Sequence, residues 1–162
     1  MNIQLRERTE AHVRTYFAAT RDPEIQSMLH QAAQTVEQAV ADFYKTQLPG
    51  ATSFGRTIYA DDAYVDDIWC YCIDPAEEPN AMVSYCIFEK NLWGKGIATE
   101  ALRQFLAEIT SRFALKTVGA FAWTANAASR KVMEKNGFLP VETFVEDGME
   151  AVYCQKNMDE AQ

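Results

Sequence analysis

The sequence predicts an α/β (α+β) domain in which a mixed central sheet of about seven strands is flanked by helices. Two observations carry this prediction. Short segments rich in β-branched and aromatic residues recur along the chain, and a long amphipathic helix follows the first half of them. The chain has 162 residues, of which 48% are hydrophobic, so it can bury a core as a single domain over residues 1–162.

The first third of the chain is predicted to form one strand followed by helices. Ile3 and Leu5 alternate with polar neighbours, which is the period of a half-buried strand. Thr9 and Thr35 precede helical apolar patterns and are expected to cap them, the second with Gln38 at capping-box spacing. These signals place two main helices before the sheet resumes.

The middle of the chain is predicted to form an antiparallel meander and then the long helix. Residues 53–60, 63–73 and 80–88 are strand-like and are separated by short polar turns. From Ile97 to Phe113, apolar residues recur every fourth position, which is typical of an amphipathic helix.

The last part alternates strand, helix and hairpin. A helix is predicted over residues 126–136, with Gly137 as its left-handed C-terminal cap. Asp147-Gly148 is a favoured pair for a tight hairpin turn. The remaining strands are predicted at 117–123, 138–146 and 149–157.

Charge and composition exclude several classes of protein. The formal net charge of -8 argues against binding to nucleic acid, which depends on clustered Lys and Arg. No segment is as apolar as a membrane span, and a cytoplasmic location is expected. His12 and His30 are expected at the surface, and no metal site is expected. The cysteines are expected to be buried free thiols: Cys70, Cys72, Cys86 and Cys154.

A glycine-rich loop precedes the long helix and is the main chemical signal. Gly94 and Gly96 flank Lys95, so the backbone can turn with positive φ and direct several N–H groups at one anion. The alternative is a tight connection without a ligand. The spacing lacks the GxxxxGK pattern of a Walker loop, and the loop comes too late in the chain for a dinucleotide fingerprint.

Two motifs give this loop a family context. Residues 93–102 read WGKGIATEAL and residues 126–138 read NAASRKVMEKNGF. In this order and spacing they resemble the GNAT superfamily of N-acetyltransferases, and most of all its ribosomal-protein N-terminal (alanine/serine) acetyltransferase branch. The resemblance implies the GNAT acyl-CoA N-acyltransferase fold, an acetyl-CoA cofactor and direct acetyl transfer to an amine.

The resemblance also implies which residues contact acetyl-CoA. Ile87 and Phe88 would lie beside the pantetheine arm, and Asn126 would meet it from the following helix, or serve as a plain N-cap. The pyrophosphate would be wrapped by Trp93, Gly94, Lys95, Gly96, Ile97 and Ala98.

One residue is implied as a proton donor. Ser129 matches a position from which relatives protonate the departing thiolate, although a serine is also ordinary in a first helical turn. Many family members carry a tyrosine for this task where this chain has Met133. No cysteine lies at a motif position, so no acyl-enzyme is expected.

The general base is left open by the sequence. The glutamate that some relatives carry before the asparagine helix is replaced by Phe121-Ala122-Trp123. Glu89 is the first candidate to replace it, and Glu146 and Glu150 are others, although each also fits a solvated surface carboxylate. Four further acids either attract a cationic amine or keep turns and an edge strand soluble: Asp61, Asp62, Asp66 and Asp67.

The sequence therefore predicts an enzyme that acetylates a protein N-terminus or a small-molecule amine. The alternative is an inactive module that binds acetyl-CoA as a sensor. Relatives often form homodimers by strand pairing, and nothing in this sequence decides that point.

Overall fold

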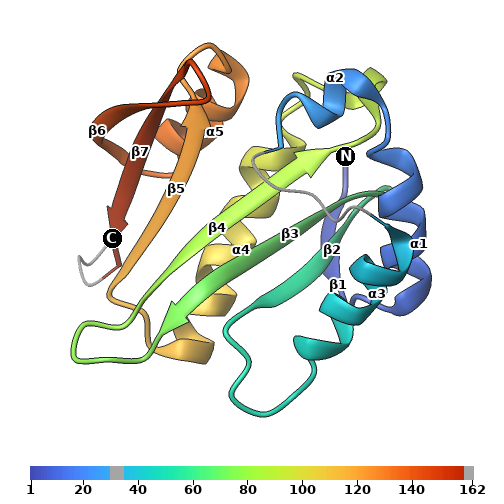
Figure 1. The fold of residues 1–162 in the computed structure, drawn as a ribbon, viewed down its shortest axis with the longest axis horizontal. Coiled ribbons are helices and arrows are strands. Elements are labelled where there is room, and N and C mark those ends of the chain that lie inside the picture. Colours follow the sequence, from blue (N-terminus) through green and yellow to red (C-terminus); the bar gives the residue numbers. More distant parts are fainter. Residues whose placement is uncertain (30–34, 159–162) are drawn as a thin grey trace.

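The computed structural model describes residues 1–29 and 35–158, and its sheet has seven strands in the order β1-β2-β3-β4-β5-β7-β6 (Figure 1). The strands are β1 (Ile3–Arg6), β2 (Phe54–Ala60), β3 (Ala63–Asp74), β4 (Asn80–Ile87), β5 (Thr117–Trp123), β6 (Leu139–Glu146) and β7 (Met149–Asn157). The helices are α1 (Glu10–Ala19), α2 (Pro23–Gln26), α3 (Val36–Lys45), α4 (Ile97–Phe113) and α5 (Ala127–Lys135). The predicted seven-strand mixed sheet is confirmed.

The predicted meander and C-terminal hairpin are both present. β2, β3 and β4 pair antiparallel in sequence order, and β6 pairs antiparallel with β7. Asp147 and Gly148 both have positive φ, 52° and 77°, as a two-residue turn between twisted strands requires. One connection is parallel: β5 joins β4 at the middle of the sheet.

Polar side chains begin the N-terminal helices as predicted. The Thr9 hydroxyl accepts from the His12 N–H, and the Thr9 N–H donates to His12 Nδ1, so this helix carries a reciprocal capping box. The Thr35 hydroxyl accepts from the Gln38 N–H at 3.1 Å. Asp22, before Pro23, caps the short helix α2.

The C-terminal end of α5 also follows the prediction. Gly137 has φ +87°, and the Phe138 N–H donates to the Met133 carbonyl at 3.0 Å. Phe138 itself is buried, so the chain turns back over the last helical turn. One short element was not predicted, a 3-10 helix η1 at Lys90–Leu92.

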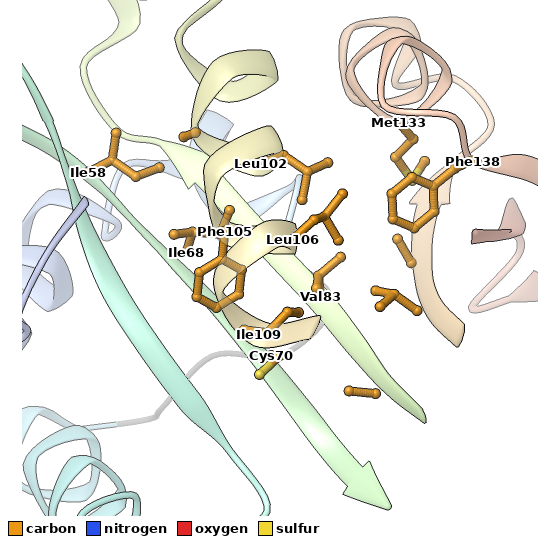
Figure 2. Close-up of a cluster of buried hydrophobic side chains, with 14 of the residues drawn as sticks. Ile58, Ile68, Cys70, Val83, Leu102, Phe105, Leu106, Ile109, Met133 and Phe138 are labelled. Atoms are coloured by element: carbon orange, nitrogen blue, oxygen red, sulfur yellow. The ribbon is translucent and has the colours of Figure 1, made fainter. Parts of the chain in front are cut away.

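The main core lies between the sheet and α4. Figure 2 shows Leu102, Phe105, Leu106 and Ile109 of α4 directed toward sheet residues that include Ile58, Ile68 and Val83. Met133 and Phe138 extend the same cluster to α5. The apolar residues that recur every fourth position in α4 therefore pack against the sheet, and this packing fixes the helix on one face of the sheet.

A smaller cluster packs α1 and α2 against the end of β4. Its buried members are Ile25, Cys86 and Phe88, and Tyr16 and Tyr64 pack around them. The Phe88 ring lies edge-on to Tyr64, with centroids 5.2 Å apart. This packing fixes the end of β4 from one side, and α4 fixes it from the other.

No described helix is long and apolar enough to cross a membrane. Two predictions about the exposure of side chains need correction. Cys70, Cys86 and Cys154 are buried free thiols, but Cys72 is exposed and has φ +51°. His12 is half-buried, because its ring lies against Tyr59 and Tyr64 and its Nε2 is 2.7 Å from the Tyr59 hydroxyl. His30 lies outside the described residues.

Candidate active site

Strands β4 and β5 are paired at one end only. Their parallel register covers Asn80↔Thr117, Ala81↔Val118 and Met82↔Gly119. Beyond Met82, β4 continues to Ile87 and β5 continues to Trp123, and Figure 1 shows the two strands diverging. Backbone groups along a splayed strand can pair with an extended ligand in place of a neighbouring strand.

The glycine loop lies at the end of β4 and at the start of α4. Gly94 and Gly96 have φ values of 78° and 82°, and a Cβ added at either would meet no atom within 4 Å. These positions combine a left-handed backbone with open space, so glycine is favoured at both for its conformation. The open space is where the loop would receive a ligand.

The start of α4 adds unpaired backbone donors to this loop. Gly96 is the N-cap residue, and no described side chain caps the helix. Glu100 is the residue whose N–H bonds back to Gly96, at 3.1 Å, so the N–H groups of the first turn before it have no intrahelical acceptor. They add to the positive end of the helix dipole, an arrangement that suits a phosphate.

Side chains hold the loop to β4 and hold the preceding helix η1 to α2. The Trp93 indole N–H donates to the Ile87 carbonyl at 2.7 Å. Lys90, in η1, forms ion pairs with Asp22 at 2.7 Å and with Glu24 at 3.0 Å. The loop is therefore preorganised, although these surface pairs each add little stability.

The other residues implied as cofactor contacts lie at this site, but most could act only through their backbone. The side chains of Ile87 and Ile97 are buried in the main core, and Phe88 belongs to the smaller cluster. Ala98 packs against the main core as well. Lys95 is exposed, so its side chain extends toward solvent.

The N-terminus of α5 is close to the side chain of Tyr85, on the diverging part of β4. Asn126 is the N-cap, and its Oδ1 accepts from the Ser129 N–H at 3.2 Å, which satisfies the capping interpretation. The half-buried Ser129 has its Oγ 3.5 Å from the Tyr85 hydroxyl. Met133, at the position of the missing tyrosine, is 1% exposed in the core and offers no polar group.

The candidate bases differ sharply in exposure. Glu89 is exposed at the end of β4, and Glu146 and Glu150 are exposed on the β6–β7 hairpin. The expectation that Asp66 and Asp67 keep an edge strand soluble is wrong. β3 lies inside the sheet, and both acids are buried, at 0% and 1% exposure.

The buried acids form a network that sequence reasoning missed. Asp66 accepts from the Cys86 N–H at 2.7 Å and from the Asp67 N–H at 2.6 Å, and burial raises its pKa well above the ordinary value. Asp67 lies 2.9 Å from Arg8 and 2.5 Å from the Tyr64 hydroxyl. Burial raises the pKa of Asp67 to about 6, and Arg8 opposes that shift.

This network fixes the strand that borders the opening. Because Cys86 belongs to β4, the Asp66 carboxylate anchors β4 to β3 by a side-chain bond in addition to the ladder. Both carboxylates are enclosed, so neither is placed to touch an acceptor molecule. The sequence signal for these buried acids is the pair Asp66-Asp67 within an otherwise apolar strand segment, which reads YVDDIW.

The arrangement defines a class of protein: a splayed mixed sheet with a glycine loop and an uncapped helix N-terminus at the start of the central helix. A family model described as acetyltransferase (GNAT) domain matches residues 2–139, and the chain belongs to this family. No curated protein matches the chain in sequence.

Solved structures show the same fold at low sequence identity. AAC(6')-Ib, an aminoglycoside acetyltransferase solved with acetyl-CoA, is 14% identical, with a TM-score of 0.82 over 98% of this chain and 95% of that one. RimL, a ribosomal L7/L12 α-N-protein acetyltransferase solved with coenzyme A, is 17% identical, with a TM-score of 0.82 over 98% and 96%. A spermidine N-acetyltransferase from Vibrio cholerae, solved with CoA and spermine, is 13% identical, with a TM-score of 0.83 over 97% and 96%.

Proposed function

We propose that this protein binds acetyl-CoA and transfers its acetyl group directly to an amine. The observation that carries the proposal is the loop Trp93–Ala98, whose open glycine positions and uncapped helix start lie beside the splayed end of β4. The N–H groups without an intrahelical acceptor at the start of α4 suit a pyrophosphate, and the positive φ at Gly94 and Gly96 lets the backbone turn there. Family membership supports the same reaction.

The chain's own residues divide the binding tasks. Backbone N–H groups from Gly94 to Ala98 would bind the pyrophosphate, and the splayed backbone near Ile87 and Phe88 would border the pantetheine arm. When bound, acetyl-CoA supplies the acetyl group as a thioester. Ser129, at the start of α5, would donate a hydrogen bond toward the sulfur as negative charge develops there.

The pKa of the acceptor amine decides how much help it needs from a base. Deprotonating a lysine-like amine at pH 7 costs roughly 4.6 kcal/mol, but an α-amine near pKa 8 costs only about 1 kcal/mol. Because Glu89 is exposed and the buried acids are enclosed, the site favours an amine that needs little help from a base. A protein N-terminal α-amine, as in the ribosomal-protein branch, is therefore proposed ahead of a small-molecule amine, with Glu89 as base.

Turnover with three acceptors tests this proposal. The purified protein would be given acetyl-CoA with a peptide that begins with Ser, with spermidine, or with kanamycin, and CoA release would be followed. The proposal predicts amine-dependent release, fastest with the peptide. Faster release with spermidine or kanamycin would reject the acceptor assignment, and binding without turnover of any of the three would favour the sensor alternative.

A further inference from the structure

Tyr85 connects β4 to α5 across the opening between the diverging strands. Its hydroxyl lies 3.4 Å from the carbonyl oxygen of Ser129 and 3.5 Å from its Oγ. Both distances exceed the roughly 2.5–3.0 Å that is usual for hydroxyl hydrogen bonds, as is common in free enzymes before a ligand tightens the site. From the other side, the Ser129 N–H donates to Asn126 Oδ1. Ser129 is thus contacted by groups from two elements.

The direction of the Tyr85 hydrogen bond follows from the groups that it faces. A carbonyl oxygen can only accept, so the tyrosine hydroxyl is the donor toward the Ser129 carbonyl. The ring packs against the main core, and burial raises the pKa of Tyr85 to about 12. The hydroxyl therefore keeps its proton at neutral pH and remains a donor.

We propose that Tyr85 is a positioning residue for the hydroxyl of Ser129. In this arrangement the single hydroxyl hydrogen of Tyr85 is shared between the carbonyl oxygen and Oγ of Ser129, so that Oγ accepts and the serine hydrogen is left to be donated into the opening, where the sulfur of the cofactor would leave. This inference rests on the proposed acetyl transfer and adds to it a residue that lies outside both sequence motifs. Tyr85 also places a phenol near Ser129. The buried Met133, at the position where many family members have a tyrosine, cannot do so.

The proton balance shows why Tyr85 positions and does not itself protonate. In the transfer, the bond between the acetyl carbon and nitrogen forms, the bond from that carbon to sulfur breaks, and the amine loses one proton to water or a base. A thiol has a pKa of roughly 8.5, and burial raises the pKa of Tyr85 to about 12, so Tyr85 is a poorer proton donor to the thiolate than an ordinary tyrosine. The serine hydrogen bond stabilises the developing charge, and the thiolate finally takes its proton from solvent.

A binding experiment tests the inference without measuring turnover. Dissociation constants for CoA and for desulfo-CoA, which lacks the sulfur, would be measured by calorimetry at pH 9, where much of the CoA thiol is ionised. The wild-type protein is expected to bind CoA about five to ten times more tightly than desulfo-CoA. Both Ser129→Ala and Tyr85→Phe should lose this preference. Tyr71→Phe, which removes another partly buried tyrosine hydroxyl, from β3, should keep it.

The outcomes separate this inference from the proposed function. If neither ligand binds the folded wild-type protein, the proposed function fails, and the inference fails with it. If both ligands bind but the wild-type protein shows no preference, or Tyr85→Phe keeps a preference that Ser129→Ala loses, only the inference is overturned.

Kinetics of the same variants give a second, independent test. With the best acceptor of the three-amine screen, Tyr85→Phe should lower kcat about five- to tenfold and leave the KM for acetyl-CoA nearly unchanged. In a Ser129→Ala background, the second substitution should have no further effect, because Tyr85 acts through Ser129. Losses that multiply in the double variant would show that Tyr85 acts independently and would overturn the proposal.

Discussion

The indole N–H of Trp93 donates to the carbonyl oxygen of Ile87 at 2.7 Å, and this bond joins the glycine loop to the last residue of β4. The Ile87 carbonyl is therefore already engaged in the free protein. The aromatic residue at the start of the WGKG motif thus has a structural task, which is to fix the loop relative to the splayed strand. The neighbouring glycines are left to form the open part of the loop.

Replacing this indole should weaken cofactor binding. Trp93→Phe keeps an aromatic ring but removes the donor, which should cost about 1 kcal/mol of loop order and raise the acetyl-CoA Kd roughly fivefold. Calorimetric titration measures this change. Trp69→Phe, on β3, is the control and should bind as the wild type does. Equal affinity for the wild type and Trp93→Phe would show that the bond does not order the loop.

A side chain at Gly119, the last β5 residue paired with β4, would force the Tyr153 and Met82 side chains to shift. A Cβ there would lie 2.6 Å from the Tyr153 hydroxyl and 2.8 Å from the Met82 sulfur. Gly119→Ala is expected to lower the free energy of unfolding by about 1–3 kcal/mol, measured by urea denaturation. At Gly55, the nearest contact of such a Cβ is 3.3 Å, with Trp69 Cβ, so Gly55→Ala should cost less. The reverse order of the two variants would contradict this packing.

The buried Asp67 should make stability depend on pH between about 4 and 7. Its folded pKa of about 6 is higher than its ordinary value of 3.8, so the folded state binds the proton more tightly than the unfolded state. The stabilisation is fully present below the unfolded pKa and is lost as pH rises through about 6. The shift corresponds to roughly 3 kcal/mol across this range.

Asp67→Asn removes this contribution, because the amide has a similar shape and does not titrate, and it also removes the charge that helps to raise the pKa of the neighbouring Asp66. Urea unfolding at pH 4.5 and pH 7.5 should show a smaller loss of stability with rising pH in this variant than in the wild type. The exposed Asp62→Asn serves as the control and should keep the wild-type dependence. An unchanged pH dependence in Asp67→Asn would show that the Asp67 carboxyl is not responsible.

The parts of the fold that were predictable are those coded by local patterns. The fourfold apolar spacing from Ile97 predicted α4, and Asp147-Gly148 predicted the β6–β7 turn, because both depend on neighbouring residues. The positive φ of the loop glycines Gly94 and Gly96 was likewise predictable, since glycine is the residue that adopts this backbone conformation without strain. Local propensity and tertiary structure agree at these positions.

The missed features depend on contacts between distant parts of the chain. From the sequence alone, Asp67 resembles an exposed acid on a strand. In the fold it is buried and pairs with Arg8, which lies 2.9 Å away and comes from a segment near the N-terminus. Tyr85 carries no motif, and its relation to Ser129 arises only because β4 and α5 meet across 44 residues of sequence. Such pairs are created by tertiary packing, and local sequence patterns do not indicate them.

Titration of acetyl-CoA into the folded, cofactor-free protein by calorimetry, with NAD and ATP as controls, tests whether the glycine loop binds the cofactor. We expect saturable binding of acetyl-CoA alone and a loss of affinity of about a hundredfold or more in Gly96→Glu, where a carboxylate would enter the glycine loop. Gly50→Glu is the matched control, because Gly50 also has positive φ and open space around it, and it should bind normally. Unchanged affinity in a folded Gly96→Glu variant, or no acetyl-CoA binding by the wild-type protein, would contradict the assignment of this site.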